Sequence, residues 1–199
     1  MIDRTIPFYN TILKCENYIP SKILLPKGYS FRNYQAGDEK AWAKLEYEIG
    51  DFKSLVTAEN YFLSEYGQNI HDLKERCVFV LNQEGEIVGS CIAWRDNKRG
   101  QTVASLHWLI VSPEQQGKGL GKALCQKVLD IFQELNEFPV YIHTQPWSYI
   151  AILLYIRLGF QLQKTDTFFH YENQYVQSMN VLKNILTIQQ YQELAANSS

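Results

Sequence analysis

The stretch Leu109-Ile-Val-Ser-Pro-Glu-Gln-Gln-Gly-Lys-Gly-Leu-Gly121 decides the fold of this chain. It begins with an apolar run that ends at Val111, passes through a short polar turn, and carries glycines at positions 117, 119 and 121. This pattern predicts a strand, a loop and the first turn of a helix. The first N–H groups of a helix have no intrahelical acceptor and lie at the positive end of its dipole. The stretch therefore predicts a binding site for a phosphate-bearing ligand.

The spacing of the glycines excludes two common phosphate-binding loops. A P-loop requires glycine where this chain has Gln116, and a hydroxyl-bearing residue where it has Ala123. A dinucleotide-binding fingerprint requires its third glycine where Lys122 stands. The loop is therefore of a different kind, unless it is only a turn before an ordinary amphipathic helix.

Residues 116–121, Gln-Gly-Lys-Gly-Leu-Gly, match the pattern Q/R-x-x-G-x-G/A. With the flanking residues 106–124, they resemble the central strand, loop and helix of the GNAT acyl-CoA-dependent N-acetyltransferases. A second stretch, Leu-Tyr-Ile-Arg-Leu-Gly-Phe at 154–160, resembles that family's Tyr-x-x-x-Gly-Phe motif. The distance between the motifs fits one helix and one strand. The resemblance covers about residues 28–165 and implies that the chain is such an enzyme.

The fold class that the resemblance implies is α/β, the GNAT acyl-CoA N-acyltransferase fold. In this fold the central mixed, mostly antiparallel sheet has splayed central strands and is flanked by helices. Periodicity along the chain predicts the matching order β-α-α-β-β-β-α-β-α-β. We expect a helix N-cap at Thr57 and a helix C′ residue at Gly159. The predicted strands are 29–34, 77–81, 87–94, 104–111 and 139–144, and the predicted helices are 37–49, 58–66, 120–136 and 148–158.

Length and composition indicate one globular domain. The chain has 199 residues, of which 46% are hydrophobic and 20% are charged. We predict an N-terminal extension over residues 1–27 and an acetyltransferase domain over residues 28–199. The aromatic C-terminal part (Phe168, Phe169, Tyr171, Tyr175) could pair in a homodimer or simply pack on the domain.

Charge and cysteine usage argue against several partners. The net charge is −2 and no long run of Lys and Arg occurs, so neither a nucleic acid nor an anionic membrane is expected as a partner. No signal-peptide run and no apolar stretch of membrane-spanning length is present, so we predict a cytoplasmic location. The four cysteines contain no C-x-x-C pair, so no metal site is predicted, and Cys77 and Cys91 are expected in the core.

The resemblance implies acetyl-CoA as the acyl donor. The backbone of Leu109, Ile110 and Val111 would pair with the pantetheine, and the N–H groups from Gly117 to Lys122 would hold the pyrophosphate. Ser148 stands where many relatives have a CoA-contacting Asn, and it is also a good N-cap. The implied cofactor-binding residues are Leu109, Ile110, Val111, Gln116, Gly117, Lys118, Gly119, Leu120, Gly121, Lys122 and Ser148.

The catalytic residues are also implied by the resemblance. Tyr155 occupies the position of the family's tyrosine, the general acid that protonates the departing CoA sulfur; the alternative is a core tyrosine. His143 and His107 lie on adjacent predicted central strands, and a neutral imidazole suits proton removal from an ammonium group. Each histidine is either a base at the acceptor end of the site or a packed structural residue. Relatives that deprotonate through water chains have no single base.

The predicted function is transfer of acetyl from acetyl-CoA to a primary amine, by direct attack in a ternary complex. The acceptor is a small-molecule amine or an amine of a peptide or protein. A non-catalytic acyl-CoA-binding or sensing module is the alternative. Acidic residues in the region expected over the acceptor either attract the amine or simply face solvent; these are Glu46, Glu48, Asp51, Glu59 and Glu65.

Overall fold

The computed structural model describes residues 3–199 and shows the predicted class of fold. Its strands are hydrogen-bonded in the order β2-β3-β4-β5-β6-β1-β7, in one mostly antiparallel sheet flanked by helices. The contacts divide the chain into two compact units, which are described in turn. The first contains residues 20–94 and 106–131, and the second contains residues up to 19, 95–105 and 132–199.

The strands of the first unit form an antiparallel arrangement. Strand β2 (Ser30–Asn33) pairs with β3 (Cys77–Leu81), which pairs with β4 (Ile87–Lys98). The register shifts between Val80 and Leu81, where one residue of β4 is skipped. The next strand in order is β5 (Gln101–Val111), whose second half belongs to this unit. The predictions of strands at 29–34, 77–81, 87–94 and 104–111 are thus confirmed to within a few residues.

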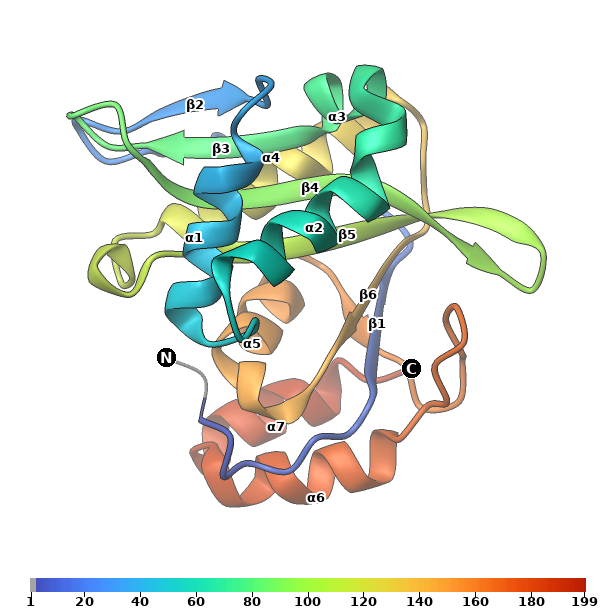
Figure 1. Ribbon diagram of the computed structural model, residues 1–199. Helices are drawn as coiled ribbons and strands as arrows, with labels where there is room; N and C mark the ends of the chain where they lie inside the picture. Colours follow the sequence, from blue (N-terminus) through green and yellow to red (C-terminus); the bar gives the residue numbers. More distant parts are fainter. Residues whose placement is uncertain (1–2) are drawn as a thin grey trace. The chain divides into compact units, whose positions relative to one another are not determined.

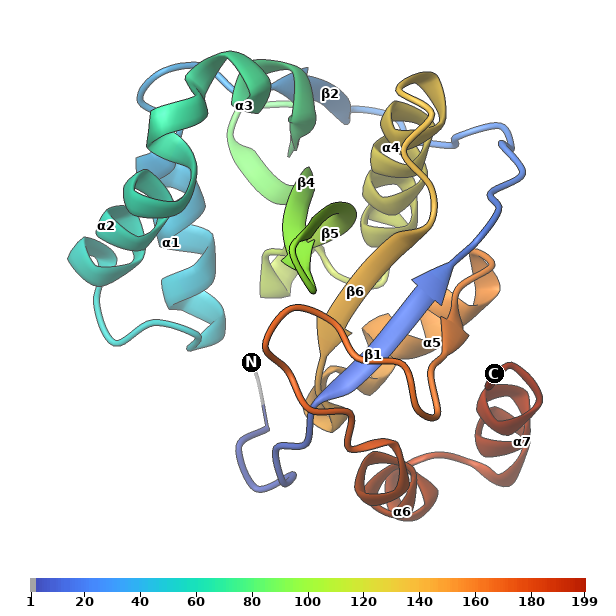
Figure 2. The same cartoon turned by 90° about the vertical axis from the view of Figure 1, so that its right-hand side faces the viewer.

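Helices cover both faces of these strands. Helices α1 (Glu39–Ile49) and α2 (Leu55–Tyr66) lie on one face, and α4 (Leu120–Glu134) lies on the other (Figures 1 and 2). After α2, a 3-10 turn (Gly67–Asn69) leads into α3 (Ile70–Arg76), which the sequence analysis did not predict. Apolar residues cover the inner faces of these helices, and Cys77 and Cys91 are fully buried as predicted.

The predicted N-cap at Thr57 is wrong by three residues. Helix α2 begins after Ser54, whose hydroxyl accepts a hydrogen bond from the Thr57 backbone N–H at 3.1 Å. The Thr57 hydroxyl in turn accepts from the Ser54 N–H at 3.2 Å, which completes a capping box. Both residues are good cap formers, and Ser54 is selected because its backbone is extended while Thr57 is already helical.

The second unit is built around three short strands. Strand β1 (Thr11–Cys15) lies between β6 (Val140–Thr144) and β7 (Gln161–Leu162), antiparallel to both. Strand β5 pairs with β6 in parallel, with Ala104 opposite Val140 and Ser105 opposite Tyr141. These pairs lie in the first half of the 11-residue strand β5. Within the predicted extension 1–27, a strand therefore forms that the sequence analysis did not predict.

Helices complete the second unit. A 3-10 turn (Pro146–Ser148) precedes α5 (Tyr149–Arg157), and α6 (Tyr175–Ile185) and α7 (Ile188–Ala196) follow at the end of the chain. Helix α7 packs against both α5 and α6. Gly159 follows α5 with a φ of 96°, which confirms the predicted C′ residue. None of the described helices is long and apolar enough to cross a membrane.

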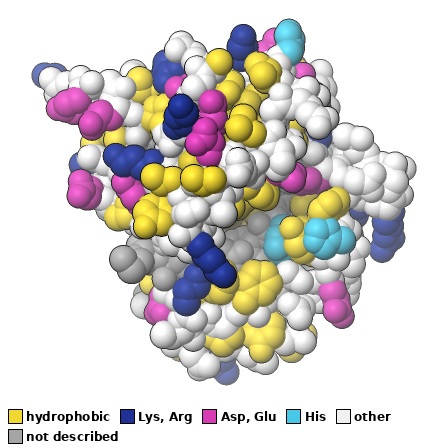
Figure 3. All heavy atoms as spheres, viewed as in Figure 1, with side chains coloured by type: hydrophobic (Ala, Val, Ile, Leu, Met, Phe, Trp, Pro, Cys, Tyr) yellow, Lys and Arg dark blue, Asp and Glu magenta, His cyan; other side chains and the backbone are white. Residues whose placement is uncertain are grey.

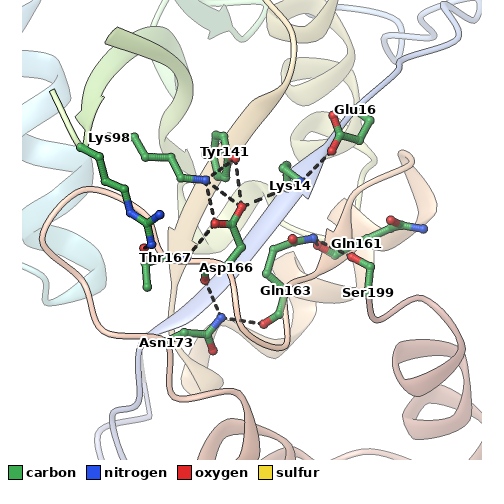
Figure 4. Close-up of polar contacts among 11 residues, drawn as sticks. Lys14, Glu16, Lys98, Tyr141, Gln161, Gln163, Asp166, Thr167, Asn173 and Ser199 are labelled. Carbon is green, nitrogen blue, oxygen red and sulfur yellow. Dashed lines mark hydrogen bonds and ion pairs between the residues drawn. The ribbon is translucent and has the colours of Figure 1, made fainter. Parts of the chain in front are cut away.

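A polar network anchors the loop after β7 (Figure 4). The Lys98 ammonium lies 2.8 and 2.7 Å from the two carboxylate oxygens of Asp166, and the Tyr141 hydroxyl donates to the same carboxylate at 3.1 Å. The Asn173 side chain donates to the Asp166 carbonyl at 2.7 Å. Burial opposes the ionised form of Asp166, but the hydrogen bonds from Lys98 and Tyr141 outweigh it and lower the pKa of its carboxyl. The network fixes the loop by charge and hydrogen bonds.

Gly89 of β4 lies close to β5 and α4. A Cβ atom added there would lie 2.8 Å from the Ile110 carbonyl oxygen and 3.2 Å from the Leu124 side chain. We expect Gly89→Ala to lower the free energy of unfolding by about 1–3 kcal/mol, because backbone must move to admit the methyl group. Urea denaturation measures this change.

Gly67→Ala is the matched control for that substitution. Its added Cβ would meet only the Leu63 side chain, at an ordinary 3.8 Å, so a change within about 0.5 kcal/mol is expected. A Gly89→Ala protein as stable as the parent would show that β4 does not approach β5 and α4 as closely as described.

Candidate active site

The predicted phosphate-binding loop lies between β5 and α4 in the first unit. Strand β5 ends at Val111, a 3-10 turn spans Pro113–Gln115, and α4 begins at Leu120. The Ala123 N–H donates to the Gly119 carbonyl at 3.1 Å and makes the first hydrogen bond of the helix. The preceding N–H groups, from Leu120 to Lys122, precede that first bond and have no intrahelical acceptor. They form the positive end of the helix dipole.

Two glycines keep the loop backbone open. Gly117 and Gly119 have φ values of 78° and 82°, a conformation that side-chain-bearing residues rarely adopt. A Cβ atom built on either glycine would have no heavy atom within 4 Å among the described neighbours. An anion can therefore approach the loop amides without displacing protein atoms. These residues fit a phosphate group by their donors, their dipole and their open space.

Side chains hold the loop in this shape. Gln116 donates from its amide to the Val111 carbonyl at 3.0 Å, which joins the loop to the end of β5. The Lys118 ammonium donates to the Gln115 side chain at 2.6 Å and to the Tyr29 hydroxyl at 3.1 Å. Lys118 and Lys122 are both exposed, so their charges lie at the surface beside the loop. The predicted choice between a phosphate-binding and a solvated role stays open for both lysines.

Strand β5 is distorted immediately before the predicted pantetheine segment. Trp108 has a φ of 49°, although a non-glycine residue in a strand is normally extended. The distortion interrupts the strict alternation of side chains, and a bulge of this kind re-aims the chain that follows. After it, Ile110 is buried while Leu109 and Val111 are half-buried. No sequence pattern indicated the distortion.

His107, one of the two predicted bases, also lies in the first unit. Its Nδ1 atom is 2.8 Å from the Tyr66 hydroxyl of α2, and the two rings meet edge to face with centroids 6.1 Å apart. The imidazole is half-buried. The hydrogen bond orients the ring and engages one of its nitrogens. Its role as a base stays a prediction.

His143, the other predicted base, lies on β6 in the second unit. Its Nε2 atom is 2.8 Å from the Asn10 side-chain oxygen, and its ring stacks on Tyr171 with centroids 3.4 Å apart. Burial lowers the pKa of the imidazole to about 4, and the nearby His170 acts in the same direction. His143 is therefore neutral at pH 7, as a base requires. Its proton affinity is lower than that of a base matched to neutral pH.

Tyr155 and Ser148 lie on either end of α5 in the same unit as His143. The Tyr155 side chain is only 5% exposed, and its ring lies 5.8 Å from that of Phe160. Ser148 occupies the N-cap position as predicted, but makes no capping hydrogen bond. Its hydroxyl instead accepts a hydrogen bond from the Gln145 side chain at 2.8 Å. The roles of both residues toward CoA stay predictions.

Sequence analysis did not single out an aromatic cluster beside the β5 distortion. Its four rings, which we call the aromatic quartet, are those of Trp42, Phe52, Tyr61 and Trp108. Trp108 lies 5.3 Å from both Trp42 and Tyr61 between ring centroids. Figure 3 shows the surface above α1 and α2, where hydrophobic and charged side chains alternate. The aromatic residues Trp42, Phe52 and Tyr61 between positions 42 and 61 were the available signal.

Within residues 3–199, no group of three or more His, Cys, Asp or Glu side chains is arranged to hold a metal ion.

Comparison with known proteins shows which family the chain is similar to. A sequence model of the acetyltransferase (GNAT) family matches residues 40–160, more than half of the chain. An uncharacterized N-acetyltransferase from Methanocaldococcus jannaschii is 26% identical over 74% of the chain and 67% of the relative. The spermidine N(1)-acetyltransferase of Escherichia coli K12 is 32% identical over 49% of the chain and 52% of the relative.

The fold is shared with solved structures. A GCN5-related N-acetyltransferase from Sphaerobacter thermophilus has a TM-score of 0.61 and 22% sequence identity, over 77% of this chain and 48% of that chain. The chain spans about half the length of several curated relatives that it matches. The match to each of these relatives therefore covers only part of that relative.

The pKa of His143 gives a testable pH dependence. In the unfolded chain the imidazole titrates near its ordinary value of 6.5, and in the folded protein at about 4. Between these pH values the imidazole is protonated in the unfolded chain but not in the folded protein. The contribution of His143 to the free energy of unfolding is therefore fully present above pH 6.5, and it is lost as the pH falls toward 4. We expect His143 to contribute a loss of roughly 3 kcal/mol over this window.

Urea denaturation at several pH values, compared between the parent protein and His143→Asn, isolates this contribution. The variant should lose less stability than the parent between pH 6.5 and 4. Proton NMR of the imidazole gives the pKa directly, and a His143 resonance that titrates near pH 6.5 would contradict the described burial.

Proposed function

Because the chain belongs to the acetyltransferase (GNAT) family, we propose that it transfers an acetyl group from acetyl-CoA to a primary amine. The observation that carries this proposal is the open loop at the N-terminus of α4. Unpaired backbone N–H groups and the helix dipole suit the pyrophosphate of CoA, and the positive φ values of Gly117 and Gly119 leave room for it. The backbone of Leu109–Val111 would bind the pantetheine.

The proposed reaction is direct attack in a ternary complex. The neutral amine nitrogen attacks the thioester carbon, the new C–N bond forms and the C–S bond breaks. The departing sulfur takes one proton and becomes the thiol. An ammonium substrate therefore releases one net proton to solvent for each amide formed. The requirements are a held thioester, an amine that has lost its proton and a proton donor for sulfur.

Tyr155 is proposed as the donor of that proton, from its place in the Tyr-x-x-x-Gly-Phe motif. A phenol loses a proton with difficulty at pH 7 but can give one to a thiolate as it forms. His107 and His143 are the proposed candidates for amine deprotonation. The lowered pKa of His143 makes it a weak base at neutral pH, so a water chain is an alternative route.

The acceptor class follows from the same proposal. A named relative of this chain is a spermidine N(1)-acetyltransferase, which supports a small aliphatic amine as the acceptor here. A peptide or protein amine is the other acceptor class that we retain. A thiol-release assay with acetyl-CoA and a panel of amines tests the activity. Acetyl-CoA binding without turnover of any amine would indicate the non-catalytic acyl-CoA-binding module instead.

The loop gives the first prediction from this proposal. Gly119→Ala should weaken acetyl-CoA binding at least tenfold, because a methyl group would stand where the pyrophosphate approaches. Isothermal titration calorimetry measures the affinity. The left-handed backbone at this position also predicts a loss of about 1–2 kcal/mol in stability.

Gly85→Ala is the control that separates the loss of acetyl-CoA affinity from the loss of stability. Gly85 lies in the β3–β4 turn with the same φ of 82° and with nothing within 4 Å of an added Cβ. We expect a similar loss of stability and unchanged acetyl-CoA affinity. Equal affinities for Gly119→Ala and the parent protein would place the phosphate elsewhere.

The proposed acid gives the second prediction. Tyr155→Phe should lower kcat by about 100-fold or more, with a small change in the KM for acetyl-CoA, because proton donation acts only on the leaving sulfur. Tyr149→Phe, on the same helix, is the matched control and should keep the parental kcat. A Tyr155→Phe protein that turns over amines at the parental rate would remove the acid role.

A further inference from the structure

One carboxyl group in the first unit is buried in a way that needs an explanation. Glu46 of α1 is 1% exposed, and neither of its carboxyl oxygens has a hydrogen-bond partner within the described part of the chain. One helical turn earlier, the Trp42 Nε1 atom is also buried without a partner in residues 3–199. Sequence analysis grouped Glu46 with acidic residues that face solvent or attract an amine. The structure excludes the solvent-facing alternative for this residue.

The arrangement is costly for folding. A buried polar group without a hydrogen bond loses its hydration and gains nothing in return. Burial raises the pKa of Glu46 well above its ordinary value, and the negative charge of Asp51 acts in the same direction. Burial consequently favours the neutral form of the carboxyl when nothing is bound.

The chain folds back beside Glu46 immediately after α1. Gly50 has a φ of 90°, and the Asp51 N–H donates to the Glu46 carbonyl at 3.0 Å. This reversal brings Phe52 against Trp42, with ring centroids 5.9 Å apart. Because Trp42 and Glu46 are four residues apart on one helix, both lie on the face that the returning segment covers.

The aromatic quartet extends from this face toward solvent. Trp42 is fully buried, whereas Phe52, Tyr61 and Trp108 are half-buried. Phe52 and Trp108 each lie close to Tyr61, with centroids 5.3 Å away in both cases. The quartet is thus packed internally, and three of its rings, those of Phe52, Tyr61 and Trp108, are partly exposed. Aromatic faces attract cations, and a buried carboxyl beside them can neutralise one.

The position of the quartet in the chain connects it to the proposed reaction. Trp108 directly precedes Leu109–Val111, the segment proposed to bind the pantetheine. A group that binds at the quartet is therefore close along β5 to the acyl donor. This is where the part of an acceptor that is not acetylated could be recognised.

We propose that Glu46 and the aromatic quartet recognise a second positively charged group of the acceptor, so that the substrate is a diamine or polyamine. This rests on the proposed acetyltransferase function. The ammonium group donates hydrogen bonds to the Glu46 carboxylate and lies against the half-buried rings. Binding converts the neutral carboxyl into a carboxylate, and its proton leaves to solvent. The substrate charge thus supplies the partner that Glu46 lacks in the free protein.

A kinetic comparison tests the proposal. We expect the parent protein to prefer 1,4-diaminobutane over 4-amino-1-butanol in kcat/KM, because these amines differ mainly in one terminal charge. Glu46→Gln should reduce that preference about tenfold to hundredfold, the range for hydrogen bonds to charged groups. Glu48→Gln removes an exposed carboxylate of the same helix and should leave the preference unchanged. An equal preference in Glu46→Gln and the parent would overturn the proposal.

Calorimetry on the unmutated protein gives a readout independent of folding defects and of turnover. With CoA present, each of the two amines is titrated in two buffers of different ionisation enthalpy. We expect 1,4-diaminobutane to release about one proton more than 4-amino-1-butanol does. Equal proton release by the two amines would overturn the proposal, as would be expected if a buried water satisfied Glu46.

The two proposals fail in different ways. Diamine binding with proton release, in a protein that does not bind acetyl-CoA, would overturn the acetyltransferase function and retain the cation site. Acetylation of both amines without diamine preference would retain the function and overturn the role of Glu46.

Discussion

The backbone conformation at Gly117 and Gly119 is the constraint on which the proposed chemistry depends. These two residues with positive φ let the chain turn from the end of β5 into α4. The Gln116 side chain, bonded to the Val111 carbonyl, fixes the start of this turn. Because α4 makes its first hydrogen bond from Ala123, the preceding amides are available to an anion. The proposed phosphate site would thus rest on backbone geometry.

The carboxyl groups of Asp166 and Glu46 differ in whether they have hydrogen-bond partners. In the second unit, Asp166 is satisfied by Lys98 and Tyr141, so its burial stabilises a loop at low cost. In the first unit, the Glu46 carboxyl is buried with no hydrogen-bond partner in the described chain. Networks that are fully paired specify structure, whereas an orphaned carboxyl is a cost that function can explain. This contrast is the reason for assigning Glu46 to recognition and Asp166 to structure.

Sequence patterns anticipated the parts of the fold that local rules govern. The glycine spacing predicted the loop, and alternation or helical spacing predicted most strands and helices up to residue 158. The N-cap at Ser54 was missed because Ser54 and Thr57 are equally good candidates without backbone angles. Strand Thr11–Cys15 was missed because its partners, β6 and β7, lie far away in sequence and supply its stability. The distortion at Trp108 and the burial of Glu46 depend on tertiary packing. For Glu46 one sequence signal existed, because it lies four residues after Trp42 and so on the apolar face of the same helix.

The most direct test of the central claim is an NMR titration of the backbone amides with acetyl-CoA. The account predicts that the largest changes in amide chemical shift fall on Gly117–Lys122 and on the end of β5. S-acetylpantetheine, which lacks the pyrophosphate, should shift the β5 amides and leave the loop unchanged. Loop amides that do not respond to saturating acetyl-CoA, or that respond equally to ATP and NADH, would contradict the assignment of this loop to acyl-CoA.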